Sequence, residues 1–325
     1  MSISQAKAPR VASKRPFRMI KGVSTMADLA DGGAVYGYPG DYPGRIYYVN
    51  NITGDSSYDG LSWDTPFDEI STAITASEAF RALPSGSTND YVRNIIYVQG
   101  TGTAYSALTA LPSYCDIIGI GADPRGNGAG IVRIIDNTTS TDAVSGSARG
   151  LYMANIQMGS DEAGGSSGYA MDLAVCFRST FENCVFWNKT SGGVRAGVLG
   201  GVTFRNCQIG GGDTSNGAVG FQVTGDNFNN CWLIDNFIYG TTHGIVIAAA
   251  AGCNNTMIKN NFIFGDTIGV DDNSTTTSHT QHAFFIENWV QSNADCFDIV
   301  ANGAEKCIGN WANEGGTTVY EDAES

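Results

Sequence analysis

Carboxylate side chains stand directly before a recurring asparagine in this 325-residue chain, and two of them are candidates for catalysis. Asp235 and Glu287 occupy this position two repeats apart. If successive repeats stack as neighbouring strands, about 4.8 Å apart, the two backbones lie about 9.6 Å apart. That separation is near the upper limit for the carboxyl pair of an inverting glycoside hydrolase. General acid–base catalysis is therefore one candidate chemistry, and a solvated surface of mixed charge is the alternative interpretation.

An aspartate-rich turn is the candidate for metal binding. The oxygen spacing of the first half of a calcium-binding loop is present at Asp55, Ser57, Asp59 and Gly60. The twelfth position of that loop is Pro66 instead of glutamate, which favours a simple turn closed by its own aspartates. His279 and His282 lie three residues apart but lack an acidic third ligand at a fixed spacing. We expect no cofactor, with calcium at Asp55 and Asp59 as the candidate exception.

The recurring asparagine marks a repeat in the second half of the chain. It occurs in FENCVF, FRNCQI, IDNFIY, KNNFIF, IENWVQ and IGNWAN at intervals of 22 to 30 residues, after a weaker copy, MANIQM. Two or three short strands per repeat predict a parallel β-helix, whose turns stack on one another. Asparagine tolerates a left-handed corner, and the amides of successive turns can form a hydrogen-bonded ladder. The predicted ladder consists of Asn183, Asn206, Asn236, Asn261, Asn288 and Asn310.

Large apolar side chains follow the asparagines. This column consists of Cys184, Cys207, Phe237, Phe262, Trp289 and Trp311. If it points inward, it is a stack in the core. If it points outward, the stripe would serve as a subunit interface or a sugar-binding platform. The sequence leaves both orientations open, because a left-handed corner residue shifts the alternation of inward and outward side chains.

Earlier turns and one helix are predicted before the repeats. Four further apolar runs, at 46–49, 95–100, 115–121 and 131–135, are predicted strands of about three earlier turns. With the seven repeats they give about ten turns. An amphipathic helix is predicted near 66–82, with a capping box at Thr65 and Asp68, Pro66 at the first helical position and a stop at Pro84. We expect this helix to cover the N-terminal end of the stack, where apolar core would otherwise meet water.

Charge is distributed unevenly along the chain. The net charge is −14, yet residues 1–22 carry six positive charges and no negative one, which leaves −20 on the remaining residues. We expect residues 1–44 to form an extended basic arm, 45–313 the β-helix and 314–325 an acidic tail. An acidic body repels phosphate groups, which disfavours direct binding of nucleic acid. The docking residues of the arm are Lys7, Arg10, Lys14, Arg15, Arg18 and Lys21.

Composition excludes several classes of protein. Charged residues make up 15% of the chain and 42 residues are glycine, which is typical of a turn-rich, all-β protein and unlike a helical bundle. The first residues lack the apolar core of a signal peptide and no run of 18 apolar residues occurs, so we expect folding in the cytosol without a membrane span. Eight cysteines without a CxxC pair predict buried thiols rather than zinc ligands.

The segment YYVNNITGDSSYDGLSWDTPFDEISTAI resembles the opening of pectin-lyase-like right-handed β-helix proteins. The later I-x-N-N-x-I and G-I-x-V units resemble the repeat of the same superfamily, and the resemblance covers about 46–313. It implies a single-stranded right-handed parallel β-helix. It implies no single function, because this scaffold carries lyases, hydrolases, epimerases, adhesins and many phage spike and decoration proteins. Lyases of the superfamily use calcium-binding aspartates with a basic residue, and hydrolases use a carboxylate pair.

We predict a structural virion protein of a tailed phage. The absent export signal, the basic arm, the acidic β-helical body and the lack of an evident catalytic cluster favour a tail spike, a tail fibre or a capsid decoration subunit in the virion. Its expected partners are other virion proteins, bound through the arm, and further copies in a homotrimer, with a host cell-surface polysaccharide as a candidate ligand. The alternative is an enzyme on the same scaffold, a polysaccharide lyase or a glycoside hydrolase.

Overall fold

The computed structural model describes most of the chain after the arm. The described residues are 44–83, 85–90, 92–126, 128–135, 142–159, 168–188, 191–211, 218–248, 252–274, 283–299, 306–314 and 317–321. The six basic residues predicted to dock the arm lie outside this range, as do His279 and His282.

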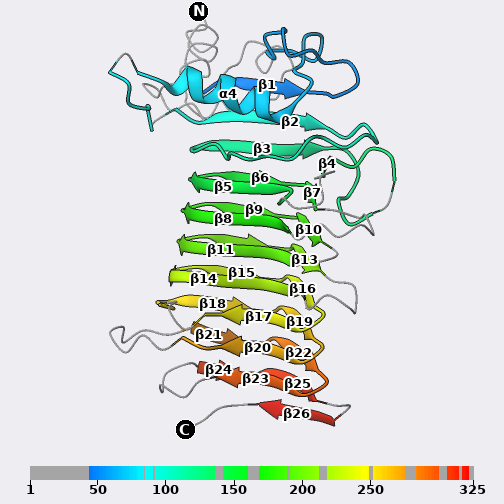
Figure 1. Cartoon of the computed structure of the whole chain (residues 1–325), viewed down its shortest axis with the longest axis vertical. Coiled ribbons are helices and arrows are strands. Elements are labelled where there is room, and N and C mark those ends of the chain that lie inside the picture. Colours follow the sequence, from blue (N-terminus) through cyan, green and yellow to red (C-terminus); the bar gives the residue numbers. More distant parts are fainter. Residues whose placement is uncertain are drawn as a thin grey trace, which may run out of the picture.

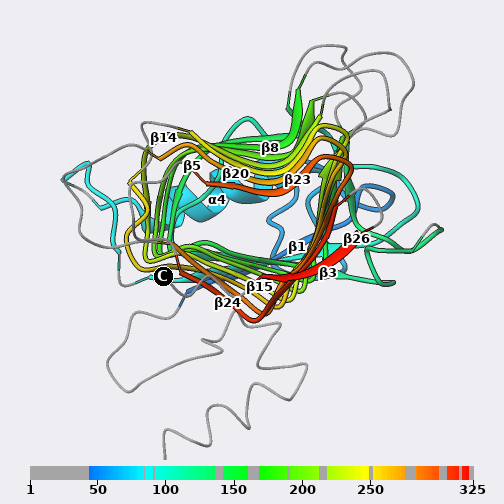
Figure 2. The same cartoon turned by 90° about the horizontal axis from the view of Figure 1, so that it is seen from below.

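The described chain winds into a stack of turns built from three sheets, which Figure 1 shows from the side and Figure 2 along the stack. The first sheet has ten parallel strands: β1 (Ile46–Val49), β2 (Asn94–Gln99), β3 (Cys115–Ile120), β6 (Tyr152–Ala154), β9 (Thr180–Glu182), β12 (Thr203–Arg205), β15 (Trp232–Ile234), β18 (Thr256–Lys259), β21 (Ala283–Ile286) and β24 (Lys306–Ile308). The all-β class and the parallel β-helix are therefore as predicted.

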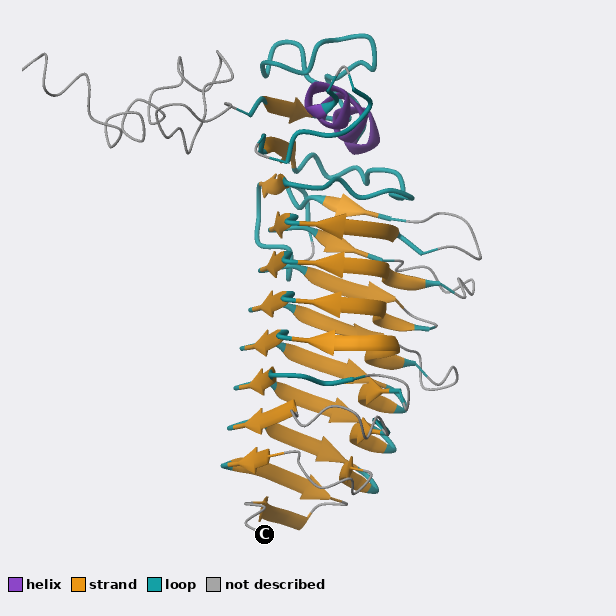
Figure 3. Cartoon of the chain, turned by 90° about the vertical axis from the view of Figure 1, so that its left-hand side faces the viewer, coloured by secondary structure: helices purple, strands orange, loops and turns teal. Residues whose placement is uncertain are grey.

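The other two sheets are continuous with the first through the turns. The second sheet contains β4 (Arg133–Ile134), β7 (Gln157–Met158), β10 (Val185–Asn188), β13 (Gln208–Gly211), β16 (Phe237–Gly240), β19 (Phe262–Gly265), β22 (Trp289–Ser292), β25 (Asn310–Glu314) and β26 (Thr317–Glu321). The third contains β5 (Val144–Arg149), β8 (Tyr169–Phe177), β11 (Gly192–Gly200), β14 (Val219–Asn229), β17 (His243–Ile247), β20 (Ile268–Asp272) and β23 (Asp295–Ile299). Figure 3 shows the strands of successive turns stacked on one another.

The number of complete turns differs from the predicted count of about ten. Within the described residues, seven turns contribute a strand to all three sheets, because the third sheet has seven strands. In the described part of the chain, β1, β2 and β24 extend the first sheet without a corresponding strand in the third. Counting one turn for each apolar run therefore overestimates the complete turns, because the first runs belong to turns that a helix and long loops interrupt.

The core lies between the sheets and is filled by one inward side chain after another. Phe181 and Phe204, in successive turns of the first sheet, are fully buried and stack with ring centroids 4.8 Å apart. All eight cysteines are buried thiols, as the sequence predicted. Burial raises the pKa of Cys115 and of Cys207 to about 12, so both stay protonated thiols at neutral pH.

The helix α4 (Ile70–Arg81) covers the N-terminal end of the stack, but it is shorter than the predicted 66–82. Phe67 is extended and bridges Val49 of β1, so the chain cannot be helical at that point. The predicted capping box is absent, because the Thr65 hydroxyl donates its hydrogen bond to Asp59 at 2.7 Å instead. The helix begins where its apolar face, which includes Ile70, first reaches the core.

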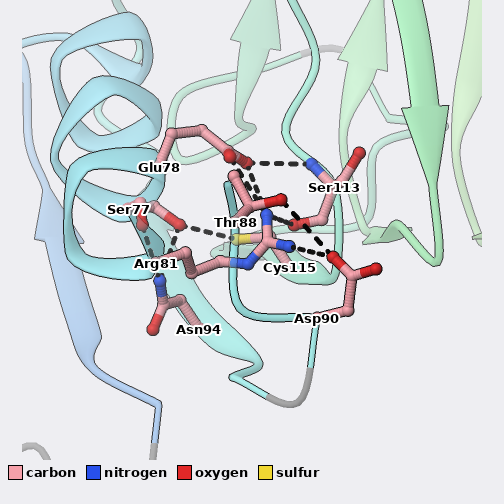
Figure 4. A network of polar contacts seen from close by, with 8 residues as sticks. All are labelled: Ser77, Glu78, Arg81, Thr88, Asp90, Asn94, Ser113 and Cys115. Carbon is pink, nitrogen blue, oxygen red and sulfur yellow. Dashed lines mark hydrogen bonds and ion pairs between the residues drawn. The ribbon is translucent and has the colours of Figure 1, made fainter. Parts of the chain in front are cut away.

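A buried arginine joins the end of α4 to the turn below it (Figure 4). The guanidinium of Arg81 donates hydrogen bonds to both carboxylate oxygens of Glu78 at 3.0 Å and to the carbonyl oxygen of Ser113 at 2.7 Å. Its other terminal nitrogen donates to Asp90 at 3.2 Å. Because Ser113 directly precedes the segment that enters β3, these contacts hold the capping helix against the β-helix.

The segment predicted as an acidic tail, 314–325, contains a strand. Thr317–Glu321 forms β26, which pairs antiparallel with β25, the last parallel strand of the second sheet. The exposed edge of that sheet is thereby covered, since an unpaired strand edge invites pairing with another chain.

Candidate functional site

The chain turns sharply between the first and second sheets, and one residue of each turn is left-handed at this corner. The residue after it is buried, and the next side chain is exposed or half-buried in every described turn except that of Val185. Asparagine and glycine suit such a corner because they tolerate positive φ. The corner residues have φ between 49° and 63°, and they are Asn155, Asn183, Asn206, Asp235, Asn260, Glu287 and Gly309.

The buried position after the corner carries a ladder of four asparagines in the last turns: Asn236, Asn261, Asn288 and Asn310. The side-chain oxygen of Asn261 accepts hydrogen bonds from the backbone N–H and the amide of Asn236, at 2.9 and 3.0 Å. The Asn261 amide donates to the Asn288 oxygen at 3.0 Å and to the carbonyl oxygen of Leu233 at 2.8 Å. Each rung therefore satisfies backbone groups of its neighbours as well as the next amide.

Asn183 and Asn206 lie one position earlier than the ladder, at the corner itself. The buried positions of their turns are occupied by Cys184 and Cys207. The amide of Asn206 donates to the oxygen of Asn183 at 3.4 Å, and Arg125 donates to both side chains from the loop after β3. The predicted ladder thus shifts by one residue for these two turns, because the asparagine fills the corner that an acidic residue fills at Asp235.

Asp235 and Glu287 are corner residues two turns apart, the separation on which the hypothesis of an acid–base pair rests. Both side chains are exposed, and the turn that carries Asn260 lies between them. Glu287 contacts Lys259, with its carboxylate oxygen 3.3 Å from the ammonium nitrogen. The ion pair with Lys259 is consistent with a solvated surface of mixed charge, and acid–base catalysis by Asp235 and Glu287 stays a prediction.

An exposed column of aromatic rings runs down the second sheet next to the corner. Phe237, Phe262, Trp289 and Trp311 are partners in the register of β16, β19, β22 and β25. Their side chains are 41%, 36%, 41% and 48% exposed, so these four point outward, whereas Cys184 and Cys207 point inward. The rings stack face to face: Phe237 and Phe262 lie 5.3 Å apart at an interplanar angle of 3°.

A second aromatic column runs parallel to the first, two residues further along each strand. Tyr239 stacks on Phe264 at 5.2 Å and on Trp187 at 5.8 Å. Trp187 reaches Tyr239 across the intervening turn because that turn has Gly210, where a Cβ atom would lie 2.9 Å from the tryptophan ring. We call the two columns together the aromatic face; it consists of Trp187, Phe237, Tyr239, Phe262, Phe264, Trp289 and Trp311.

The aromatic face is also free of formal charge. The remaining outward positions in its two columns, from β7 to β25, carry only apolar residues, glycine or amides. Gln157, Gln208, Gln291 and Asn313 are half-buried, whereas Val185 and Gly210 are buried. On a chain with a net charge of −14, a neutral face of this length is a distinctive surface.

A polar cluster lies on the outward face of the third sheet, and sequence reasoning missed it. Arg195 of β11 donates a hydrogen bond to Asp172 of β8 at 2.5 Å and lies 3.9 Å from Asp142. Its guanidinium stacks over the ring of Tyr169 at 4.7 Å, and the Tyr169 hydroxyl donates to Gln222 of β14 at 2.7 Å. The sequence did contain a signal for this cluster, which is the alternation of apolar and polar residues in M-D-L, V-R-A and F-Q-V. This alternation places one polar residue outward in each turn.

The charged groups of this cluster pair with one another, and this pairing limits the ligands that the cluster can bind. The hydrogen bond with Asp172 raises the pKa of Arg195, so the guanidinium stays charged. Burial raises the pKa of the Tyr169 hydroxyl. Two carboxylates already balance the guanidinium, so an anionic ligand would have to displace one of them. Further along the same face, His243 lies 3.7 Å from Asp271, and the neighbouring Asp272 points into the core.

Comparison with solved structures identifies the architecture. A pectate lyase, Pel9A, superposes with a TM-score of 0.50 at 12% identity, over 92% of this chain and 82% of that one. This chain has a right-handed parallel β-helix fold. A pectin methylesterase from Aspergillus niger gives a TM-score of 0.40 at 13% identity over 90% and 94% of the two chains. Pectin methylesterase PemA from Erwinia chrysanthemi gives 0.34 at 12% over 74% and 89%. No family model matches the chain, and no curated protein matches it.

The aspartate-rich turn of this β-helix is closed by its own hydrogen bonds. Asp55 accepts hydrogen bonds from the backbone and the hydroxyl of Ser57, and these bonds lower its pKa. Asp59 accepts from the Thr65 hydroxyl and the Leu61 backbone. Within the described residues, no three His, Cys, Asp or Glu side chains are grouped so that they could hold a metal ion. The described part also contains no helix with the length and hydropathy needed to cross a membrane.

Proposed function

We propose that this β-helix is a structural subunit of a larger assembly, and specifically a virion protein of a tailed phage: a tail spike, a tail fibre or a capsid decoration subunit. The observation that carries this proposal is the aromatic face. Contiguous apolar surface of this kind on a folded chain marks a site of association. In an assembly, a neighbouring protein covers such a surface and removes it from water.

The ring geometry favours a protein partner over a sugar for this face. A sugar ring packs against the flat, electron-rich face of an aromatic ring. In Phe237 and Phe262 those faces cover each other, because the rings are parallel at 5.3 Å. Tyr239 and Phe264 are stacked in the same way, 5.2 Å apart and 7° from parallel. The faces covered in this way are closed to a sugar, whereas the ring edges can pack between the side chains of another protein.

Charge separation supports attachment through the N-terminal arm. Residues 1–22 carry six positive charges on an otherwise acidic chain, a pattern typical of a tether to an acidic surface. The first described residue, Gly44, leads into β1 at the end of the stack that α4 covers. We propose that other virion proteins bind the arm there.

Immunogold labelling of particles from the producing culture tests the proposed function. With an antibody raised against residues 45–313, we expect gold at a fixed place on negatively stained particles, on the tail or on the capsid. Label confined to the soluble fraction, with unlabelled particles, would contradict the virion assignment.

A polysaccharide-acting enzyme is the second candidate, and the cluster around Arg195 favours it. Asp142, Asp172 and Arg195 project from successive turns of one sheet face, where an extended glycan could contact them. Release of reducing or unsaturated ends from capsular or pectic polysaccharides, lost in Asp172→Asn, would establish this candidate in place of a purely structural role.

A further inference from the structure

We propose that a second copy of this chain covers the aromatic face, an inference that rests on the proposed structural role and names the partner at that surface. The exposed rings are concentrated there: Phe237, Phe262, Trp289 and Trp311 are four of the ten large apolar side chains exposed in the described residues. Trp232 and Ile308, 50% and 49% exposed, belong to the adjoining strands of the first sheet.

The first argument for a second copy is charge. Two chains of net charge −14 repel each other wherever charged surfaces meet. Charged side chains occupy the corner, at Asp235 and Glu287, and the third sheet, at Asp172 and Asp271. The aromatic face is neutral along its two columns, so two acidic copies can approach there without burying a carboxylate.

The second argument is the repeat distance. Neighbouring rings in the columns lie 5.2 to 6.3 Å apart, and they follow the spacing of about 4.8 Å between parallel strands. A second copy has the same spacing by construction. A contact made at one turn therefore recurs at the next, from Phe237 to Trp311. A partner whose structure repeats at a different distance cannot repeat the contact in this way.

Both arguments predict side-by-side association of the stacks. A single patch that packs against its own copy forms a two-fold interface, whereas a homotrimer requires this face to meet a different surface of the neighbour. In either assembly the rings of the aromatic face are removed from water, and the β-helix itself is unchanged.

Sedimentation equilibrium of the full chain at 1–50 μM tests the proposal directly. We expect a species of two or three chains, each of 34.3 kDa. In the double variant Phe262→Gln/Trp289→Gln, which introduces a residue that the face already carries at Gln208, the dissociation constant should rise at least about 100-fold, because buried aromatic anchors dominate interfaces. Tyr58→Gln, which alters a ring 42% exposed elsewhere, is the matched control and should leave the mass unchanged.

The outcomes separate this inference from the proposed function. A monomeric wild-type chain throughout this concentration range would overturn the second-copy interface. If that monomer still joined particles, and the double variant with a wild-type circular dichroism spectrum did not, the structural role would stand with a different partner on the face. An oligomer that the double variant leaves intact would also overturn the inference, because another surface would then hold the copies together.

Discussion

Replacing Asn261 with leucine is expected to lower the free energy of unfolding by about 2–4 kcal/mol. The substitution removes the oxygen that accepts from the backbone N–H and the amide of Asn236, and the amide that serves the carbonyl oxygen of Leu233. These groups are buried in the corner, so water cannot replace the lost partner. Each unsatisfied buried group costs about 1–3 kcal/mol. Chemical denaturation followed by circular dichroism measures the change.

Asn206→Gly is the matched control for the ladder. Asn206 is an exposed corner residue with φ of 51°, a conformation that glycine adopts without strain. Its loss removes contacts to Asn183 and Arg125 at the surface, so we expect a change below about 1 kcal/mol. If Asn206→Gly and Asn261→Leu destabilised the chain equally, the division into corner and ladder positions would be wrong.

Deleting residues 1–22 is expected to abolish docking to the particle and leave the β-helix folded. The segment contains six of the 18 basic residues, and the described core is built from residues after 44. Exposed ion pairs weaken as salt rises, so docking of the intact chain should decline between about 0.05 and 0.5 M NaCl. Cosedimentation of purified protein with particles that lack it measures docking, and thermal melting measures the fold.

A second variant separates the effect of the lost charge on docking from the effect of the lost chain length. Changing the six basic residues of the arm to glutamine keeps its length, and we expect it to fail in docking like the deletion. Normal docking by either variant would contradict attachment through the arm.

The fold was predictable because the same residue types recur at equivalent positions of each repeat. An asparagine or acidic corner followed by a short apolar run recurs often enough to indicate stacked turns. Details that depend on one residue of register were not predictable. Alignment on asparagine placed Asn183 and Asn206 in the buried ladder, whereas the backbone conformation at the corner puts them one position earlier. The same uncertainty of one residue left open whether Phe237, Phe262, Trp289 and Trp311 point inward or outward.

The cluster on the third sheet was missed for a different reason. Its members, Asp172, Arg195 and Gln222, occupy equivalent positions in successive turns but differ in chemical type. A search for one repeated residue passes over such a column. Only the strand register, which pairs Asp172 with Arg195 and Arg195 with Gln222, shows that they share a face.

Burial of the aromatic face in the assembled protein is the central claim, and hydroxyl-radical footprinting of the assembly measures it most directly. Within one chain, Trp289 and Tyr58 are almost equally exposed, at 41% and 42%. Mass spectrometry of the irradiated assembly reports the oxidation rate of each ring in a single sample. We expect Trp289 and Trp311 to be oxidised several-fold more slowly than Tyr58, because a neighbouring chain excludes water from them. Oxidation of all three rings at similar rates would contradict the account.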